Sequence, residues 1–361
     1  MARKPDRPLR KGWTTGACAT AAARAAYGAL LSGDFTDPVE ITLPRGEQPR
    51  FALAHSRLAE GYAEAAVVKD AGDDPDVTHG ATIHVRVELG EPGGGVQFRA
   101  GSGVGTATLP GLPIAVGEPA INPAPRAMMG EAIAALAAEH GAPGDVVITI
   151  SIEGGEALAA KTWNPRLGII GGLSILGTTG IVIPYSCAAW IHSIHSGIDV
   201  ARASGFDHVA GSTGKTSEAA VKAHYSLDDV ALLDMGDFAG GMLKYLHRNP
   251  LPWVTIAGGF AKLTKLAQGH LDLHSSRSQV DFADLAGVVE GLGAAPQLIA
   301  RVRGANTANQ ALNLAEQAGL PLADLVARRA RETALATLAG KTRLDVMVIS
   351  RGGKVIGHAG A

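Results

Sequence analysis

The chain has 361 residues, 46% of them hydrophobic and 18% charged, which excludes a disordered protein and gives enough length for two domains. With 32 Lys and Arg against 34 Asp and Glu, the formal net charge of -2 indicates no broad nucleic-acid or acidic-membrane surface. Two distant cysteines, an N-terminus without an apolar signal core and a longest apolar tract too glycine-rich to cross a membrane predict a cytoplasmic protein.

The first half mixes predicted helices and strands without a regular alternation. A helix is predicted at 14–32, with Gly33 as its end, and a second at 125–140 after a loop rich in glycine and proline. Short strands are predicted at 39–43, 64–68, 82–89, 96–99 and 146–152. Residues 1–200 therefore read as a mixed α+β domain, and a helix predicted at 186–204 joins the two halves.

From residue 201 the pattern becomes regular, because each strand is followed by a turn and a helix. The predicted strands are 208–210, 230–234 and 253–257, and the helices are 217–225, 238–247 and 260–268. This repeat is typical of a parallel, Rossmann-like sheet. Residues 281–340 are mostly helical, and 344–349 with 354–357 predict a closing hairpin. The fold class is therefore α/β, with a Rossmann-like domain at 201–361.

Residues 161–186 combine glycines and hydroxyl side chains without any carboxylate. The glycines are Gly168, Gly171, Gly172, Gly177 and Gly180. Such a backbone can approach a ligand closely and present bare N–H groups to an anion. The same composition fits a buried strand–turn–strand whose glycines serve packing, and composition favours neither interpretation.

The segment Gly211-Ser-Thr-Gly-Lys-Thr216 resembles a phosphate-binding loop at the start of a helix. The Walker pattern needs a glycine where Val209 stands, which disfavours an ATPase or GTPase. Asp234 ends the next strand, where nucleotide-binding sheets place a ribose-binding carboxylate. Nicotinamide cofactors and S-adenosylmethionine both use such a carboxylate. Alternatively, Asp234 caps the turn 234–237.

Three other segments carry candidate polar contacts. The loop 69–80 is rich in aspartate without EF-hand spacing, so it forms either a turn or a ligand-facing loop. The proline-locked segment 118–126 holds Asn122 and Arg126 either towards a substrate carboxylate or at the surface. His274 belongs to a polar cluster that follows a strand end, where open α/β sheets bind ligands.

Several motifs together resemble one known family. They are Gly12-Trp-Thr-Thr-Gly-Ala-Cys-Ala19, Lys69-Asp-Ala-Gly-Asp-Asp-Pro-Asp-Val-Thr78, Gly117-Glu-Pro-Ala-Ile-Asn-Pro123, residues 164–180, Gly236-Asp-Phe-Ala-Gly240 and Lys262-Leu-Thr-Lys-Leu-Ala-Gln-Gly-His270. In this order, nearly end to end, they resemble the cobalt-precorrin-5B C1-methyltransferase family (the CbiD family). One departure is Phe260-Ala261-Lys262, where the family's pattern leads us to expect a Gly-Lys pair.

The resemblance implies methyl transfer from S-adenosylmethionine to C1 of cobalt-precorrin-5B, giving cobalt-precorrin-6A in anaerobic cobalamin biosynthesis. S-adenosylmethionine would be the cofactor and a polycarboxylate corrinoid the substrate. Cobalt would arrive inside the substrate, so no protein metal site is expected, and neither nucleic acid nor membrane is an expected partner. A homo-oligomer stays open. The alternatives are a nicotinamide-dependent oxidoreductase and a non-catalytic corrinoid-binding protein.

The candidate residues then take three roles. The methyl donor is expected in the second domain, at Gly211, Thr213, Gly214, Asp234, Asp237 and Gly258. The substrate is expected at Lys69, Asn122, Arg126, Asn164, Arg166, Gly171, Gly172, Thr178, Lys262 and His274. The groups proposed to manage a proton are Asp70, Asp73 and His79. A strong general base is unnecessary if an electron-rich ring carbon is the nucleophile.

Overall fold

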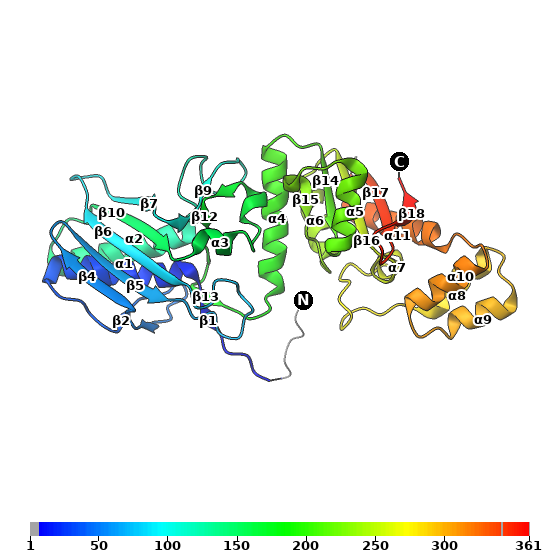
Figure 1. Cartoon of the computed structure of the whole chain (residues 1–361), viewed down its shortest axis with the longest axis horizontal. Coiled ribbons are helices and arrows are strands. Elements are labelled where there is room, and N and C mark those ends of the chain that lie inside the picture. The colour runs from blue at the N-terminus through cyan, green and yellow to red at the C-terminus, as the bar shows by residue number, and fades with distance from the viewer. Residues whose placement is uncertain (1–6, 341, 361) are drawn as a thin grey trace. The chain divides into compact units, whose positions relative to one another are not determined.

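A computed structural model describes residues 7–340 and 342–360, and its mixed helices and sheets confirm the α/β class. The chain divides into two compact units, residues 1–187 and 188–361. The helix α4 (Cys187–Ala203), which the sequence analysis predicted to join the two halves, lies almost wholly in the second unit. Figure 1 shows the elements of each unit in the colour of their chain position.

The first unit is built on a five-stranded sheet with the order β4-β5-β6-β10-β7. Its strands are β4 (His55–Ala59), β5 (Tyr62–Val68), β6 (Thr82–Leu89), β7 (Val96–Ala100) and β10 (Val146–Ile152). β10 runs antiparallel to β6 and parallel to β7. Burial alternates along β6, which matches a sheet with one face on the core.

Two long helices form the second layer of this unit. α1 (Thr15–Ser32) packs on β5 and β6, and α2 (Pro123–His140) packs on α1 (Figure 1). The Thr14 side chain caps α1 by accepting from the Ala17 N–H, and Gly33 ends it at a φ of 85°. The alanine-rich body of α1 is buried, because small side chains let its backbone approach both the sheet and α2.

Short paired segments complete the first unit. They are β1 (Gly12–Trp13) with β13 (Ile181–Val182), β2 (Val39–Glu40) with β3 (Arg50–Phe51), β8 (Gly103–Val104) with β12 (Gly172–Leu173), and β9 (Thr106–Ala107) with β11 (Ile169–Ile170). The strand predicted at 39–43 is wrong beyond Glu40, since Ile41 and Leu43 donate to Pro49 and Glu47 outside a regular ladder. A short helix, α3 (Gly155–Ala159), and the 3-10 turn η1 (Asn164–Leu167) precede the glycine-rich segment.

The second unit contains a five-stranded sheet with the order β15-β14-β16-β17-β18. Its strands are β14 (His208–Ser212), β15 (Leu232–Leu233), β16 (Trp253–Gly259), β17 (Arg343–Ile349) and β18 (Val355–Ala359). The first four are parallel, and β18 is antiparallel to β17, which confirms the predicted hairpin. The strand order reverses direction at β14, between its neighbours β15 and β16.

Helices connect and cover these strands. They are α5 (Lys215–Tyr225), α6 (Ala239–Arg248), α7 (Phe260–Ala267), α8 (Phe282–Gly291), α9 (Pro296–Arg303), α10 (Ala308–Gln317) and α11 (Leu322–Leu338), with the 3-10 turn η2 (Asp229–Ala231) before β15. α11 packs on α7 and on the β17–β18 hairpin, while α8, α9 and α10 pack against one another (Figure 1). None of the described helices combines the length and apolar character that crossing a bilayer requires.

Candidate functional site

A cavity of about 600 Å³ opens at the carboxyl ends of the parallel strands in the second unit. Residues 213–217 line it after β14, residues 259–262 after β16, and residues 349–351 and 354 at the β17–β18 turn. The loops after β14 and β16 meet here because the strand order reverses between them, which is where open α/β sheets bind ligands. The volume lies within the range of about 300–1,000 Å³ usual for small-molecule sites.

Two helices begin at the wall of this cavity. Gly214 precedes the first residue of α5, and Gly259 precedes the first residue of α7. The amides of a first helical turn have no carbonyl to bind within their own helix, and the helix dipole adds partial positive charge there. Both helix ends therefore favour an anionic group inside the cavity.

Positively charged side chains outnumber acidic ones in the lining. They are Lys215, Lys262, Arg351 and Lys354, and the lining carboxylate is Glu316. The Lys262 ammonium lies 2.5 Å from the Asp237 carboxylate, which is 12% exposed. Within residues 7–340 and 342–360, Lys215, Arg351 and Lys354 have no carboxylate within 4 Å. Four cations thus face two carboxylates, and the cavity is electropositive.

α10 supplies the remaining wall with two asparagines, one leucine and one glutamate. Asn309, Leu312, Asn313 and Glu316 line the cavity at a spacing that puts them on one helix face. Asn309, Asn313 and Glu316 are exposed, whereas the neighbouring Ala311 and Ala315 are fully buried against the other helices. This wall adds amide donors and acceptors to the cationic lining.

The residues predicted for the methyl donor have different places around this cavity. Thr213 and Gly214 line it, and Asp237 reaches it through its ion pair with Lys262. Gly211 and Gly258 lie behind it in tightly packed strands. A Cβ on Gly211 would lie 2.3 Å from the sulfur of Met242, and one on Gly258 would lie 2.8 Å from the Thr213 side chain.

Asp234 follows the end of β15 and lies outside the lining of the cavity. Its main-chain carbonyl accepts a hydrogen bond of 2.9 Å from the Trp190 indole. Two residues later, the Gly236 N–H donates to the Ser212 carbonyl at the end of β14 over 3.0 Å. The two strand ends are thereby tied together beside Asp234.

Among the residues predicted to bind the substrate, Lys262 lines the cavity. His274 follows Leu273, whose backbone is hydrogen-bonded to Asp237 and to Lys265 of α7. The Leu273 N–H donates to the Asp237 carbonyl over 2.8 Å, and the buried Lys265 ammonium donates to the Leu273 carbonyl over 3.0 Å. Burial lowers the pKa of Lys265. His274 itself is hydrogen-bonded through Nδ1 to the Ser276 hydroxyl at 2.7 Å.

Ala261 occupies the position before Lys262 where the family's pattern led us to expect a glycine. It is the second residue of α7, and its side chain is exposed at the cavity. An L-residue adopts helical backbone angles without strain, so an alanine keeps the same N–H direction that a glycine would have. The substitution therefore leaves the α7 N-terminus intact.

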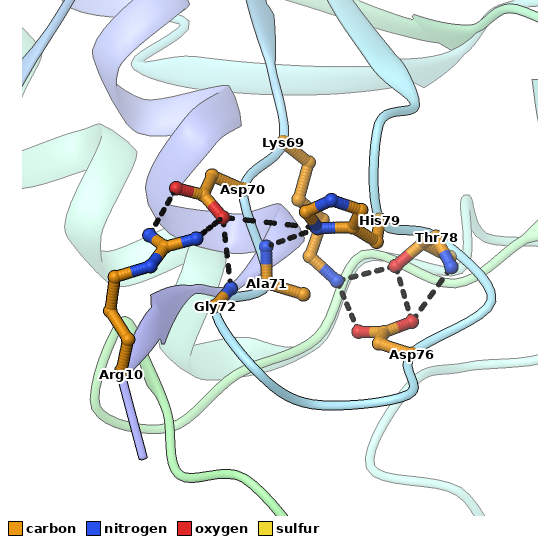
Figure 2. Close-up of polar contacts among 8 residues, drawn as sticks. All are labelled: Arg10, Lys69, Asp70, Ala71, Gly72, Asp76, Thr78 and His79. Carbon is orange, nitrogen blue, oxygen red and sulfur yellow. Dashed lines mark hydrogen bonds and ion pairs between the residues drawn. The ribbon is translucent and has the colours of Figure 1, made fainter. Parts of the chain in front are cut away.

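In the first unit, Lys69 is buried and committed to an internal ion pair (Figure 2). Its ammonium donates to the Asp76 carboxylate and the Thr78 hydroxyl. Burial alone would raise the pKa of Asp76, but the Lys69 charge and the hydrogen bonds from Lys69 and Thr78 together lower it. At 3% exposure, Lys69 has the environment of a structural residue.

Asp70 and Asp73 hold the N-terminal segment against the same loop. The Arg10 guanidinium forms a two-pronged ion pair with Asp70, and the main-chain N–H of Arg10 donates to the Asp73 carboxylate over 2.8 Å. The hydrogen bond from Arg10 lowers the pKa of Asp70 to about 2. A carboxylate this acidic and already paired is a poor proton acceptor at neutral pH.

His79 packs beside this ion pair, as Figure 2 shows. The Ala71 N–H donates to His79 Nδ1 over 3.1 Å, and the same nitrogen lies 3.8 Å from Asp70. Because Nδ1 is the acceptor, the neutral imidazole carries its proton on Nε2. The neutral ring can therefore donate a hydrogen bond through its Nε2–H.

Most glycines of the segment 161–186 fill close-packed positions. A Cβ would lie 2.5 Å from Leu109 at Gly168, 2.3 Å from the Gly103 backbone at Gly172, 2.4 Å from Thr14 at Gly177 and 2.5 Å from Leu43 at Gly180. Gly171 alone among the five has open space around it, with a φ of 88°. The packing interpretation therefore accounts for four of the five glycines.

The other substrate candidates of this unit have internal partners or lie at the surface. Asn164 is buried and donates to the Gly172 carbonyl over 3.3 Å. Arg126 donates to the Ile121 and Pro119 carbonyls over 2.9 and 3.2 Å and pairs with Glu118. Asn122 lies just before α2, and the Arg166 guanidinium lies 5.4 Å from the centre of the Trp163 ring. Thr178 is exposed.

The cavity contains several residues that the sequence analysis did not single out. They are Lys215, Arg351, Lys354, Asn309, Asn313 and Glu316. Lys215 belongs to the loop motif at 211–216, and Arg351 lies in the turn of the predicted hairpin, so the sequence placed each of them at the end of a strand. The sequence did not show that both residues line one cavity. No local pattern marks the stripe on α10. In the described ranges, no three His, Cys, Asp or Glu side chains gather as a metal site would require.

Comparisons with known proteins cover nearly the whole chain. The CbiD family model matches residues 2–184, and a model described as the CbiD C-terminal domain matches residues 272–360. Proteins named cobalt-precorrin-5B C(1)-methyltransferase are 61% identical in Paramagnetospirillum magneticum, over 98% of this chain and 99% of that protein, and 61% identical in Brucella canis, over 96% and 95%. A crystal structure of a cobalamin biosynthesis protein (cbiD) from Archaeoglobus fulgidus is 23% identical, with a TM-score of 0.40 over 86% of this chain and 85% of that chain.

Proposed function

The chain belongs to the CbiD family, and we propose that it methylates C1 of cobalt-precorrin-5B with S-adenosylmethionine as the methyl donor. The products are cobalt-precorrin-6A and S-adenosylhomocysteine, within anaerobic cobalamin biosynthesis. The observation that carries the proposal is the 61% identity to a relative of that name, because it extends over 98% of this chain. Both units are thus shared with that relative, so the whole apparatus of the reaction is expected here.

Methyl transfer from a sulfonium to a ring carbon needs no strong general acid or base. The electron pair of ring carbon C1 attacks the methyl group, the carbon–sulfur bond breaks, and the sulfur keeps the bonding pair to become a thioether. The protein's task is to align the sulfur, the methyl group and C1, and to exclude water. The ion-paired state of Asp70 and Asp73 agrees with a reaction that needs no strong general base.

We place the donor along the carboxyl ends of β14 and β15. Support comes from Asp234, which follows β15 where a ribose-binding carboxylate is expected, and from the Gly236–Ser212 hydrogen bond that joins the two strand ends. Thr213 and Gly214 would then form the wall that the donor site shares with the neighbouring cavity.

The decisive experiment is an anaerobic assay of the purified full chain with cobalt-precorrin-5B and S-adenosylmethionine. We expect a corrinoid product one methyl group heavier by mass spectrometry, with an equal amount of S-adenosylhomocysteine. In parallel, Asp234→Ala should weaken S-adenosylhomocysteine binding at least tenfold, about 1.4 kcal/mol. The exposed Asp228→Ala in the same unit is the matched control and should leave binding unchanged.

Two results would contradict the proposal. Tight corrinoid binding without any methylated product would favour a non-catalytic carrier. Micromolar binding of NADH or NADPH, without binding of S-adenosylhomocysteine, would favour an oxidoreductase.

A further inference from the structure

We propose that the electropositive cavity of the second unit is a polyanion site, which in the proposed reaction holds carboxylate side chains of the corrinoid rather than the methyl donor. The polyanion assignment follows from the cavity itself. Only the identity of its ligand rests on the proposed function.

The charges of the lining select the ligand. Lys262 is compensated by Asp237, but Lys215, Arg351 and Lys354 have no carboxylate within 4 Å among the described residues. Cations held near one another repel, and a ligand that brings negative charge relieves the repulsion. The N-termini of α5 and α7 add to the same preference.

The methyl donor is a poor match to this lining. S-adenosylmethionine carries a sulfonium and an ammonium against one carboxylate, so its reactive end is positively charged. Placing that sulfonium among Lys215, Arg351 and Lys354 would oppose like charges in a partly enclosed space. The donor site that we propose beside Asp234 avoids this opposition.

The cations come from separate elements, which favours a ligand with several anionic groups. Lys215 opens α5, Lys262 lies in the first turn of α7, and Arg351 and Lys354 belong to the β17–β18 turn. Acetate and propionate side chains project from several points of a corrin ring, so two or more of them can engage different elements at once. The guanidinium of Arg351 also suits a carboxylate through paired hydrogen bonds.

α10 gives the site a second kind of contact. Asn309 and Asn313 present amides from the wall formed by α10, where they can hydrogen-bond groups that the cations do not reach. Glu316 at the end of this stripe disfavours a carboxylate close to it. The lining is thus asymmetric, and it would bind one edge of a polycarboxylate ring in a defined orientation.

The test measures equilibrium binding to the full chain by calorimetry with four probes: cobyrinic acid, its fully methyl-esterified form, pyrophosphate and S-adenosylhomocysteine. The first two share the corrin ring and differ in their negative charge. The variant is Arg351→Gln/Lys354→Gln. The control is Lys244→Gln/Arg303→Gln, which removes the same charges from exposed positions outside the cavity.

We expect the wild type to bind cobyrinic acid at least tenfold more tightly than its ester. The cavity variant should lose at least tenfold in cobyrinic acid affinity and less than twofold in S-adenosylhomocysteine affinity, while the control variant keeps both. Raising the salt concentration should weaken cobyrinic acid binding in the wild type more than in the cavity variant.

Three outcomes would overturn the inference. Loss of S-adenosylhomocysteine affinity with unchanged cobyrinic acid affinity would assign the cavity to the donor. Equal affinities of the variant and the wild type for cobyrinic acid would remove the cavity from the corrinoid site. Tighter binding of pyrophosphate than of cobyrinic acid, lost in the cavity variant, would replace the corrinoid by a phosphate as the ligand of the polyanion site.

The assay with cobalt-precorrin-5B separates this inference from the proposed function. If no methylated product forms while cobyrinic acid binding still depends on Arg351 and Lys354, the function fails and the polyanion site stands. If product forms and the cavity variant keeps the wild-type KM for cobalt-precorrin-5B, the site fails and the function stands.

Discussion

At the scale of single residues, burial decides whether a charge serves structure or ligand. Lys69 was predicted to bind substrate carboxylates, yet it is 3% exposed and its ammonium donates hydrogen bonds to Asp76 and Thr78. Lys262 also has a carboxylate partner, Asp237, but its side chain is 36% exposed and lines a cavity. A residue type in a motif therefore does not identify its role, whereas its exposed surface and its partners do.

Lys69→Met should lower the free energy of unfolding by about 3 kcal/mol, because it leaves the Asp76 carboxylate without its buried counter-charge. Urea denaturation followed by circular dichroism measures this. The double variant Lys69→Met/Asp76→Asn should recover part of the loss, since neither charge then remains. Unchanged stability together with a raised KM for the corrinoid would instead return Lys69 to the substrate site.

At the scale of elements, the glycines divide into those that pack and those that border the cavity. Gly211 lies in β14, where an added Cβ would meet Met242 of α6 at 2.3 Å. Gly214, three residues later, has nothing within 4 Å of its Cβ direction and an extended φ of 164° that any residue adopts. The two glycines belong to one motif but have different physical reasons to be glycine.

This difference predicts opposite tolerance to alanine. Gly211→Ala should lower the free energy of unfolding by about 1–3 kcal/mol through overpacking against α6. Gly214→Ala should change it by less than about 0.5 kcal/mol, because the new methyl group projects into open space. Thermal unfolding of the two variants beside the wild type checks this, and equal losses would contradict the packing assignment.

At the scale of the whole molecule, several titratable groups have pKa values displaced in the same direction. Burial lowers the pKa of His208 to about 4, and burial also lowers the pKa of His195. The hydrogen bond from Arg10 lowers the pKa of Asp70 to about 2, and backbone hydrogen bonds from Gly93 and Gly95 lower that of Asp145. In each case the unfolded chain binds its proton at a higher pH than the folded chain.

Stability should therefore fall as the pH drops below about 6.5. Between about pH 6.5 and 4, the histidines of the unfolded chain become protonated while folded His208 stays neutral. Between about pH 4 and 2, the aspartates add a further loss by the same mechanism. Urea midpoints across this range measure both steps.

His208→Phe provides the control for the first of these steps. Phenylalanine can keep the stacking on Trp253, whose ring centre lies 3.7 Å away, but it cannot titrate. The variant should show a shallower decline than the wild type between about pH 6.5 and 4. An identical pH slope in both proteins would show that His208 does not contribute.

The regular elements were predictable because their patterns are local. The alternation of apolar residues placed β6 at 82–89 and β10 at 146–152 with their observed bounds, and Gly33 ended α1 as expected. Hydrophobic periodicity and capping residues act within a few positions of one another, so one segment contains the information. Where the backbone leaves a regular ladder, as after Glu40, the prediction failed.

The sequence by itself determined the family, the α/β class and the position of the strand–turn–helix repeats, because each depends on ordered motifs or on local periodicity. Only the tertiary structure decided which charges remain available. Lys69 is buried and paired with Asp76, whereas Lys215 converges on one cavity with Arg351 and Lys354, which lie more than a hundred residues further along the chain. The physical reason is that burial and convergence depend on how the whole chain packs around a residue, and no local pattern encodes them.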